Sequence, residues 1–235
     1  MKTTPRSRAS AAAPARERAA LNRGAIVDAA LALIDRDGLE TLSMRRLGAA
    51  LGVEAMAIYH HYAGKGELLD AVVERLLAEV RTDAPDADPL DRLRRCVASY
   101  RDVAVRHPKA FGLLTNRRFN TPAAFEFYER VLQMLADAGF DARASARMFR
   151  LIGYYINGAG LAEIASRAQQ PDATPVALEG AGEPGRPAAI DRFPRVAAVA
   201  PHLRIERLDE VFGYGLDVIF DHLRAAAPRP KPRRR

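Results

Sequence analysis

A chain of 235 residues is long enough to form one medium-sized or two small domains around a hydrophobic core. Its composition, 28% charged and 49% hydrophobic residues, excludes a wholly disordered protein, and no run of ~18 hydrophobic residues predicts a membrane span. The net charge of +7 is uneven, with +4 on residues 1–65, −3 on residues 66–223 and +6 on residues 224–235, which predicts a polyanionic partner at one end of the molecule.

The first predicted elements are a basic arm and a helix. Residues 1–22 are rich in alanine and arginine, and prolines and arginines interrupt their hydrophobic runs, so no secretory signal is predicted. We expect a disordered basic arm there, with an organellar transit peptide as the alternative. From Ile26 to Ile34, hydrophobic residues recur at helical spacing, which predicts a helix that ends at Gly38.

Two short helices joined by a tight turn are predicted next. Ser43 suits the N-cap of the first, which ends at the turn around Gly52, and the second runs from about Glu54 to Tyr62. This arrangement is typical of a helix-turn-helix, whose second helix enters the major groove of DNA. An ordinary three-helix bundle with a polar face is the alternative. The side chains expected to face inward are Leu42, Leu47, Leu51, Val53, Ile58 and Tyr62.

A larger helical region is predicted after the break at Ala63-Gly64. We expect a connecting helix from Glu67 to Arg81, and then helices opened by Asp88-Pro89 and Thr121-Pro122, because proline suits the first helical turn. Asp141 should cap a long helix that reaches about Arg167. Further along, six prolines in residues 169–202 predict a mobile loop with one helical turn near Val196. The last helix carries a hydrophobic stripe from Leu208 to Leu223, and a basic tail, 225–235, follows it.

Motifs for catalysis or metal binding are weak. The sequence GAGEPG at 180–185 matches the dinucleotide-binding pattern only formally, because it lies in a proline-rich segment and not between a strand and a helix. No nucleophile–base motif is present, and the adjacent His60 and His61 would point in different directions on a helix. The single cysteine, Cys96, suits a core position and a reducing cytoplasm. We therefore expect a protein without enzymatic activity, metal site or cofactor.

The predicted helix-turn-helix resembles the TetR family of transcriptional regulators. The residues that carry the resemblance are Ser43-Met44-Arg45-Arg46-Leu47-Gly48, Leu51-Gly52-Val53, Ile58-Tyr59-His60-His61-Tyr62, Lys65 and Leu68. The sequence departs from the family pattern at Gly48, where alanine is usual, and at Glu54, where a capping serine is common. The segments RHPKAFGLL, LADAGF and FGYGLDVIFDHL resemble the C-terminal domain of the tetracycline-repressor subgroup, so the likeness covers most of residues 23–224.

The resemblance implies an all-α protein with a three-helix DNA-binding domain, 23–66, and a helical ligand-binding and dimerisation domain, 67–224. It implies a cytoplasmic homodimer that represses transcription from a palindromic operator and is released by a ligand. The hydrophobic stripe of the last helix is expected to form the dimer interface together with the long helix before it, a buried core helix being the alternative. The alternative functions are a ligand-dependent activator, an enzyme on a helical scaffold and a structural DNA-coating protein.

Physical roles can be assigned to the residues that would face DNA. Arg45 offers a planar fork that can bind guanine O6 and N7 together, so we expect it to read a base. Ala55, Met56 and Ala57 have no side-chain donor, so readout from the second helix itself should be sparse. Hydroxyl, imidazole and ammonium groups suit phosphate oxygens. The full expected DNA-binding set is Ser43, Arg45, Arg46, Ala55, Met56, Ala57, Tyr59, His60, His61 and Lys65.

A small and largely apolar effector is expected in the larger domain. Leu113, Leu114 and Tyr154 lie where the histidines of a tetracycline–magnesium site are sought in the subgroup, so that ligand is not the expected one. Asn157, flanked by glycines, is the candidate polar contact inside an apolar cavity. A ligand there should push the segment 108–114 and swing the connecting helix. The expected pocket residues are Phe111, Leu114, Tyr128, Tyr154 and Asn157.

Overall fold

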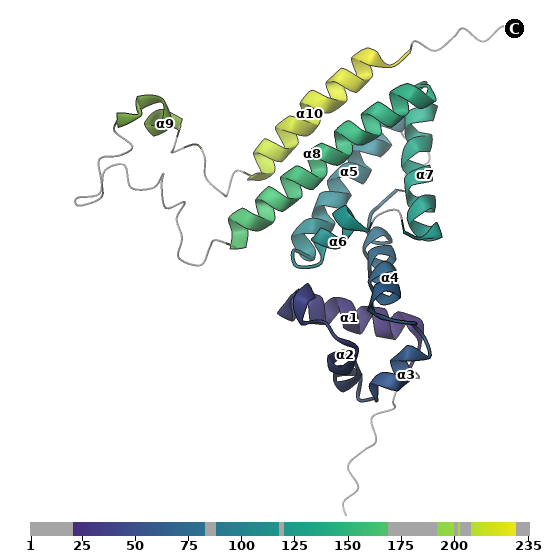
Figure 1. Cartoon of the computed structure of the whole chain (residues 1–235). Helices are drawn as coiled ribbons and strands as arrows, with labels where there is room; N and C mark the ends of the chain where they lie inside the picture. The colour runs from purple at the N-terminus through teal and green to yellow at the C-terminus, as the bar shows by residue number, and fades with distance from the viewer. Residues whose placement is uncertain are drawn as a thin grey trace, which may run out of the picture.

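The computed structural model describes residues 21–82, 88–117, 120–168, 192–199, 202 and 208–228, and these residues form helices and no strand (Figure 1). This confirms the predicted all-α fold. A small group of short helices lies at one end of the molecule, and longer helices pack side by side at the other end (Figure 1). Nearly all of the expected basic arm, most of the expected loop 169–202 and residues 229–235 of the expected tail lie outside the described residues.

The first domain is built from three α-helices; the predicted cap at Ser43 is confirmed, whereas the third helix ends at Tyr59 and not at the predicted Tyr62. The side chain of Asn22 accepts a hydrogen bond from the Ala25 backbone N–H, and Ser43 does the same for Arg46. The turn after the second α-helix depends on Gly52, whose φ of 69° lies in the left-handed region that favours glycine. The elements are α1 (Arg23–Asp37), the 3₁₀ turn η1 (Leu39–Thr41), α2 (Met44–Leu51) and α3 (Ala55–Tyr59).

The core of this domain holds α3 against α1 and α2. Leu47 and Ile58 are fully buried, and Tyr62 closes the core while its hydroxyl donates a hydrogen bond to the Arg23 carbonyl. Leu42 is also buried as expected, whereas Leu51 and Val53 are only half-buried at the turn. Leu51 and Val53 still pack against the core, so the inward-facing set was predicted correctly.

Gly48 allows an unusually close approach between α2 and the start of α3. A Cβ atom at this position would lie 2.8 Å from the Val53 carbonyl oxygen and 3.2 Å from the Ala55 backbone nitrogen. Both neighbours are backbone atoms, so neither can turn away as a side chain would. The departure from alanine at this position therefore has a structural reason.

The second domain follows α4, which connects it to the first. Asp88, Thr121 and Asp141 each accept hydrogen bonds from backbone N–H groups of the helix that they open, as predicted. The connecting helix is shorter than predicted, since it ends at Leu77. The helices are α4 (Lys65–Leu77), α5 (Pro89–Arg106), α6 (Phe111–Asn116), α7 (Pro122–Asp137), α8 (Ala142–Ala168), α9 (Pro194–Val199) and α10 (Leu208–Ala226).

The last helix, α10, packs along α5 and α8 of its own chain (Figure 1). Phe212, Leu216 and Leu223 of the predicted stripe are buried there, so these three side chains face helices of the same chain, and the predicted dimer interface of α8 and α10 stays a prediction. The approach is close because Gly215 leaves room for the Tyr155 ring, whose hydroxyl donates to the Phe212 carbonyl at 2.7 Å. The outward face of α10 carries Val211, which belongs to the predicted stripe, together with Tyr214 and Val218.

An ion-pair network fixes the same three helices. The Arg101 guanidinium on α5 donates to both carboxylate oxygens of Glu163 on α8, at 2.8 and 2.9 Å, and it also contacts Asp209 on α10. Arg167 donates to the same Glu163 carboxylate at 2.7 Å. Glu163 is only 4% exposed, and these arginines supply hydrogen bonds to its buried carboxylate.

Candidate DNA-facing surface and ligand cavity

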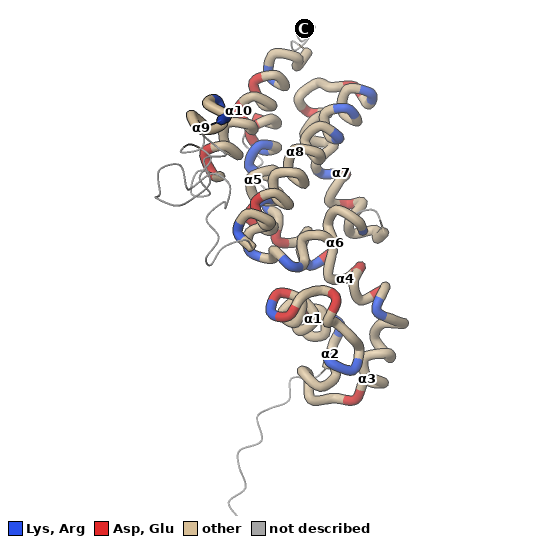
Figure 2. Tube along the Cα trace, turned by 60° about the vertical axis from the view of Figure 1, so that its left-hand side comes forward, with Lys and Arg blue, Asp and Glu red and all other residues tan. Residues whose placement is uncertain are grey.

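The residues expected to face DNA gather at the end of the molecule formed by α2, α3 and the start of α4. Met56 and Tyr59 of α3 are 63% and 44% exposed, although both have large hydrophobic surfaces. Ser43, Arg45, Arg46 and His60 are exposed, and Ala55, Ala57, His61 and Lys65 are half-buried. The basic segment of α2 lies at this end, remote from α10 (Figure 2). The structure thus brings the predicted set together on one surface.

The two adjacent arginines of α2 differ in what they contact. Arg46 lies 2.7 Å from the Asp37 carboxylate at the end of α1, and it also donates to the Thr41 carbonyl at 3.2 Å. Arg45 takes part in no hydrogen bond or ion pair within the described part of the chain, and its side chain is exposed. Arg45 is therefore available to an external partner, whereas Arg46 fastens α2 to α1.

Lys65 also has an internal role. Its Nζ atom donates a hydrogen bond to the Leu42 carbonyl at 2.7 Å and so ties the start of α4 to the residue before the Ser43 cap. An ammonium group has three donors, so this bond leaves two for phosphate. The Ser43 oxygen accepts from the backbone, which leaves its O–H as a donor.

Arg23 and Glu67 were missed by sequence reasoning. The Arg23 guanidinium lies 4.0 Å from the centre of the Tyr62 ring, donates to the His61 carbonyl and pairs with Glu67 at 2.9 Å. Glu67 also accepts from the Ala63 backbone N–H at 2.7 Å, and the hydrogen bonds from Arg23 and Ala63 lower the pKa of Glu67. A glutamate in the first turn of α4 was the available signal, because such a residue can reach back to a backbone N–H before the helix.

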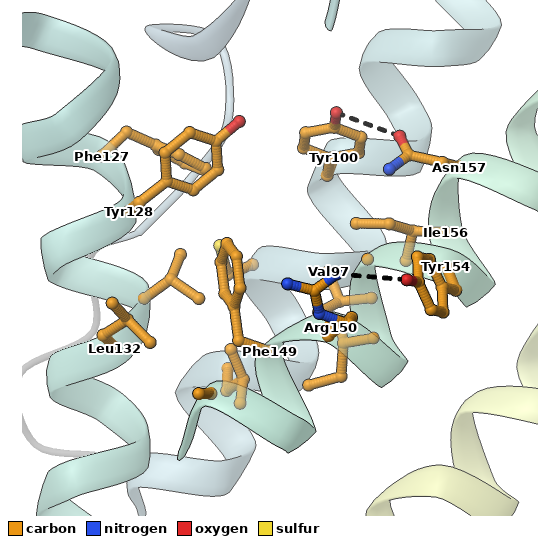
Figure 3. Close-up of a pocket in the computed structure, with 16 residues that line it drawn as sticks. Val97, Tyr100, Phe127, Tyr128, Leu132, Phe149, Arg150, Tyr154, Ile156 and Asn157 are labelled. Atoms are coloured by element: carbon orange, nitrogen blue, oxygen red, sulfur yellow. Dashed lines mark hydrogen bonds between the residues drawn. The ribbon is translucent and has the colours of Figure 1, made fainter. Parts of the chain in front are cut away.

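A cavity of about 260 Å³ lies between α5, α7 and α8 (Figure 3). Three of the expected pocket residues, Tyr128, Tyr154 and Asn157, line it. Burial raises the pKa of the Cys96 thiol in its wall to about 12, so this thiol stays protonated and is not a nucleophile. The sixteen lining residues are Leu93, Cys96, Val97, Tyr100, Phe127, Tyr128, Val131, Leu132, Ala146, Phe149, Arg150, Ile152, Gly153, Tyr154, Ile156 and Asn157.

Phe111 and Leu114 do not line the cavity, which corrects the expectation for both. They are fully buried on α6. Gly160 of α8 admits the Phe111 ring, since a Cβ there would lie 2.7 Å from a ring carbon. The same ring also meets Tyr100, at a centroid distance of 5.7 Å and an edge-on angle of 75°. Phe111 is thus one contact away from the cavity.

Polar contacts join the cavity domain to the connecting helix. Arg117, just after α6, donates to the Asp70 carboxylate of α4 at 2.8 Å and to the Gly66 carbonyl at 3.1 Å. These bonds reach the first turns of α4, next to the DNA-facing surface. A displacement of α6 would therefore pull on the segment that carries Lys65.

A second set of contacts, the α1–α5 junction, lies where α5 ends. His107 places one ring nitrogen 2.7 Å from the Asp35 carboxylate of α1 and the other 3.1 Å from the Glu79 carboxylate beyond α4. Arg75 and Arg106 also pair with Glu79. Glu79 therefore receives donors from both the connecting helix and α5.

Metal-binding clusters and membrane-spanning helices are both absent from the described residues. No group of three or more histidine, cysteine or acidic side chains among them is placed to hold a metal ion. No helix in the described ranges is long and apolar enough to cross a membrane.

Comparison with known proteins identifies relatives of both domains. The family model described as "Bacterial regulatory proteins, tetR family" matches residues 26–72, and the model described as "Tetracyclin repressor-like, C-terminal domain" matches residues 83–227.

An HTH-type transcriptional regulator of Saccharopolyspora erythraea is 33% identical over 178 residues, covering 74% of this chain and 75% of the relative. The tetracycline repressor protein class C of Escherichia coli is 34% identical over 160 residues, covering 63% and 68%. The crystal structure of the Streptomyces coelicolor TetR family protein ActR in complex with actinorhodin has a TM-score of 0.73 at 25% identity, covering 90% of this chain and 100% of that one.

Proposed function

Because the chain belongs to the TetR family of DNA-binding transcriptional regulators, we propose that it is a homodimeric repressor whose palindromic operator is released when a small, largely apolar ligand fills the cavity. The observation that carries this proposal is the cavity itself, which lies one aromatic contact from α6 and hence from the connecting helix. The TetR family is a family of transcriptional regulators and not of enzymes, so the prediction of no enzymatic activity is confirmed. The protein would act in the cytoplasm, where the operator DNA lies.

The DNA-facing surface supports specific binding through few base contacts. Arg45 is exposed and has no internal partner among the described residues, so it can extend to a guanine. The exposed hydrophobic surface of Met56 on α3 suits contact with a thymine methyl group. Ser43 and Lys65 retain donors for phosphate, which would set the register of the helices on the duplex.

Exposed apolar side chains support a second copy of the chain as partner. On α8 they are Leu151, Tyr154 and Leu161, and on α10 they are Val211, Tyr214 and Val218. The two helices lie side by side (Figure 1), so the side chains can form one continuous surface. A two-fold axis through this surface would pack two helices of each copy together and would present two DNA-facing surfaces to successive half-sites.

The switch follows from the contacts between cavity and α4. A ligand pressed against Tyr100 would displace Phe111, and therefore α6, because the two rings are in edge-on contact. Arg117 would pass this movement to α4 through Asp70. Such a ligand releases the operator only if it prefers the conformation that binds DNA poorly, and bound DNA must then weaken ligand binding by the same factor.

The test begins with selection of bound sequences from random DNA. We expect a two-fold symmetric site with half-sites about one helical turn apart, ~34–36 Å, and affinity that falls steeply with salt. Equal affinity for the selected site and for scrambled DNA at physiological salt would exclude a specific regulator.

A matched pair of variants tests the dimer in the same assay. Tyr214→Glu, at a side chain 73% exposed on α10, should give a monomer in sedimentation and lower operator affinity ~100-fold or more, because a monomer engages one half-site. Phe125→Glu is the control, at a side chain 56% exposed on α7, away from α10 (Figure 1). A Tyr214→Glu protein that remains a dimer with full affinity would place the interface elsewhere.

A further inference from the structure

The walls of the cavity are unusually aromatic. Phe127 and Tyr128 meet edge-on with centroids 5.2 Å apart, and Tyr128 meets Phe149 in the same way at 5.5 Å. Figure 3 shows these rings on one side and Tyr100 and Tyr154 on the other. The ring-to-ring contacts hold the walls in fixed orientations, and aromatic walls favour an occupant that can stack or meet them edge-on. A flat aromatic body suits this space better than a branched aliphatic one.

Arg150 is the only charged residue among the sixteen that line the cavity. Its one polar contact is the Tyr154 hydroxyl, to which it donates at 3.3 Å (Figure 3), and it has no ion pair within the described residues. Many arginines of the same domain, such as Arg92, Arg101 and Arg117, pair with carboxylates. Arg150 is thus an exposed residue in the wall of an apolar cavity, and most of its five N–H donors have no partner among the described residues.

The inner part of the cavity holds a neutral polar group. The Tyr100 hydroxyl donates to the Asn157 side-chain oxygen at 3.3 Å (Figure 3), so the Asn157 amide keeps its two N–H donors for an acceptor. No carboxylate lines the cavity, so nothing in its wall repels an anion. The lining therefore offers donors at two places, one cationic and one neutral, around an aromatic body.

We propose that the ligand of this cavity is an aromatic acid, with a flat ring body between α5, α7 and α8 and one anionic oxygen group bound by Arg150. A carboxylate or an acidic phenolic oxygen provides that group, and the planar fork of arginine suits a carboxylate through two parallel hydrogen bonds. A carbonyl or hydroxyl oxygen elsewhere on the ring body accepts from Asn157. This assignment rests on the proposed function, because it names the ligand class of the same cavity.

The test compares two acids with their neutral amides, 2-naphthoate with 2-naphthamide and 9-anthracenecarboxylate with its amide. Each pair shares size and ring system, so the difference in affinity isolates the anionic oxygen. Isothermal titration calorimetry on the full chain should show an acid binding ~10-fold or more tightly than its amide, the range of a hydrogen bond between charged groups. The proposal is overturned if the amides bind as tightly as the acids. It is also overturned if neither acid binds.

Two variants on α8 test the role of Arg150. Arg150→Gln keeps a donor for Tyr154 and removes the charge, so affinity for the acid should fall ~10-fold while affinity for the amide stays unchanged. Arg147→Gln is the matched control, since Arg147 is exposed on the same helix and does not line the cavity. Equal melting temperatures show that both variants are folded. If both variants lower acid affinity equally, or neither does, Arg150 is not the anion-binding residue.

Operator affinity in the same samples separates this inference from the proposed function. Acids that bind through Arg150 but leave operator affinity unchanged support the ligand class and overturn the ligand-released switch. An operator released by the neutral amides and not by the acids supports the switch and overturns the ligand class.

Discussion

At the scale of single residues, alanine substitutions of Arg45 and Arg46 are expected to have different effects on DNA binding and on stability. Arg45→Ala should weaken binding of the selected operator by about 1–3 kcal/mol and relax the preference for one guanine in each half-site, while leaving the melting temperature unchanged. Arg46→Ala breaks the pair with Asp37, and since this pair lies at the surface, where solvent screens it, the variant should lose little stability. Selection from random DNA and fluorescence anisotropy measure the base preference and the affinity.

The two variants serve as controls for each other. Both remove one positive charge from adjacent positions of α2, so any purely electrostatic loss should be similar in size. Relaxed base preference in Arg46→Ala with normal preference in Arg45→Ala would contradict this assignment.

The sequence predicts which side chains face DNA, but it could not show which of them already have partners within the chain. Arg46 and Lys65 were expected to face DNA, and the partners that hold them, Asp37 and the Leu42 carbonyl, come from other elements. Exposure follows from helical periodicity, which is local. Whether an exposed side chain already has a partner depends on how the helices pack against one another. The spacing of residues along the chain does not give that information.

At the scale of elements, the close contact between α2 and α3 gives a second prediction. Gly48→Ala should lower operator affinity more than it lowers stability. Alanine favours a helix over glycine by about 1 kcal/mol, which offsets part of an overpacking cost of about 1–3 kcal/mol. The obstructing atoms are the backbone of Val53 and Ala55, so α3 itself must move, and its side chains would meet the bases out of register. Thermal melts and anisotropy measure the two effects.

Gly112→Ala on α6 is the control for this substitution. A Cβ atom there meets nothing within 4 Å, so only the gain in helix propensity should remain. A Gly48→Ala protein with unchanged operator affinity would show that α3 tolerates the shift.

Helix boundaries and helix faces were predictable to different degrees. Ser43, Asp88, Thr121 and Asp141 each cap the helix that follows, and a cap needs only its neighbours in sequence. The stripe on α10 correctly indicated burial, and much of it is covered by α5 and α8 of the same chain. Hydrophobic spacing shows that a face is covered, but it does not distinguish a face covered by the same chain from one covered by a second copy. The same limit explains why Phe111 was assigned to the cavity wall and not to the layer behind it.

At the scale of the whole molecule, the α1–α5 junction joins the cavity domain directly to the DNA-binding domain, independently of α6. Glu79 accepts from Arg75 of α4 and from Arg106 and His107 of α5, while His107 also contacts Asp35 of α1. Each ring nitrogen of His107 therefore faces a carboxylate, Asp35 on one side and Glu79 on the other. The junction thus joins polar and charged groups of both domains.

This junction predicts how stability depends on pH. Burial acts to raise the pKa of Glu79, but the His107 hydrogen bond and the nearby charges of His107, Arg106 and Arg75 outweigh it, so the pKa of Glu79 is lowered on folding. A carboxyl group whose pKa is lowered in the folded state stabilises the protein above its unfolded value, about 4.3, and loses that contribution as the pH falls through the folded value. Glu79→Gln should lower the free energy of unfolding at pH 7 by about 1–3 kcal/mol, since it replaces hydrogen bonds between charged groups. Denaturant titrations from pH 7 down to about pH 3 should then show a smaller loss of stability in the variant than in the wild type. An equally steep loss in both proteins would mean that other carboxylates control the acid response, and that the α1–α5 junction does not hold the two domains together through Glu79.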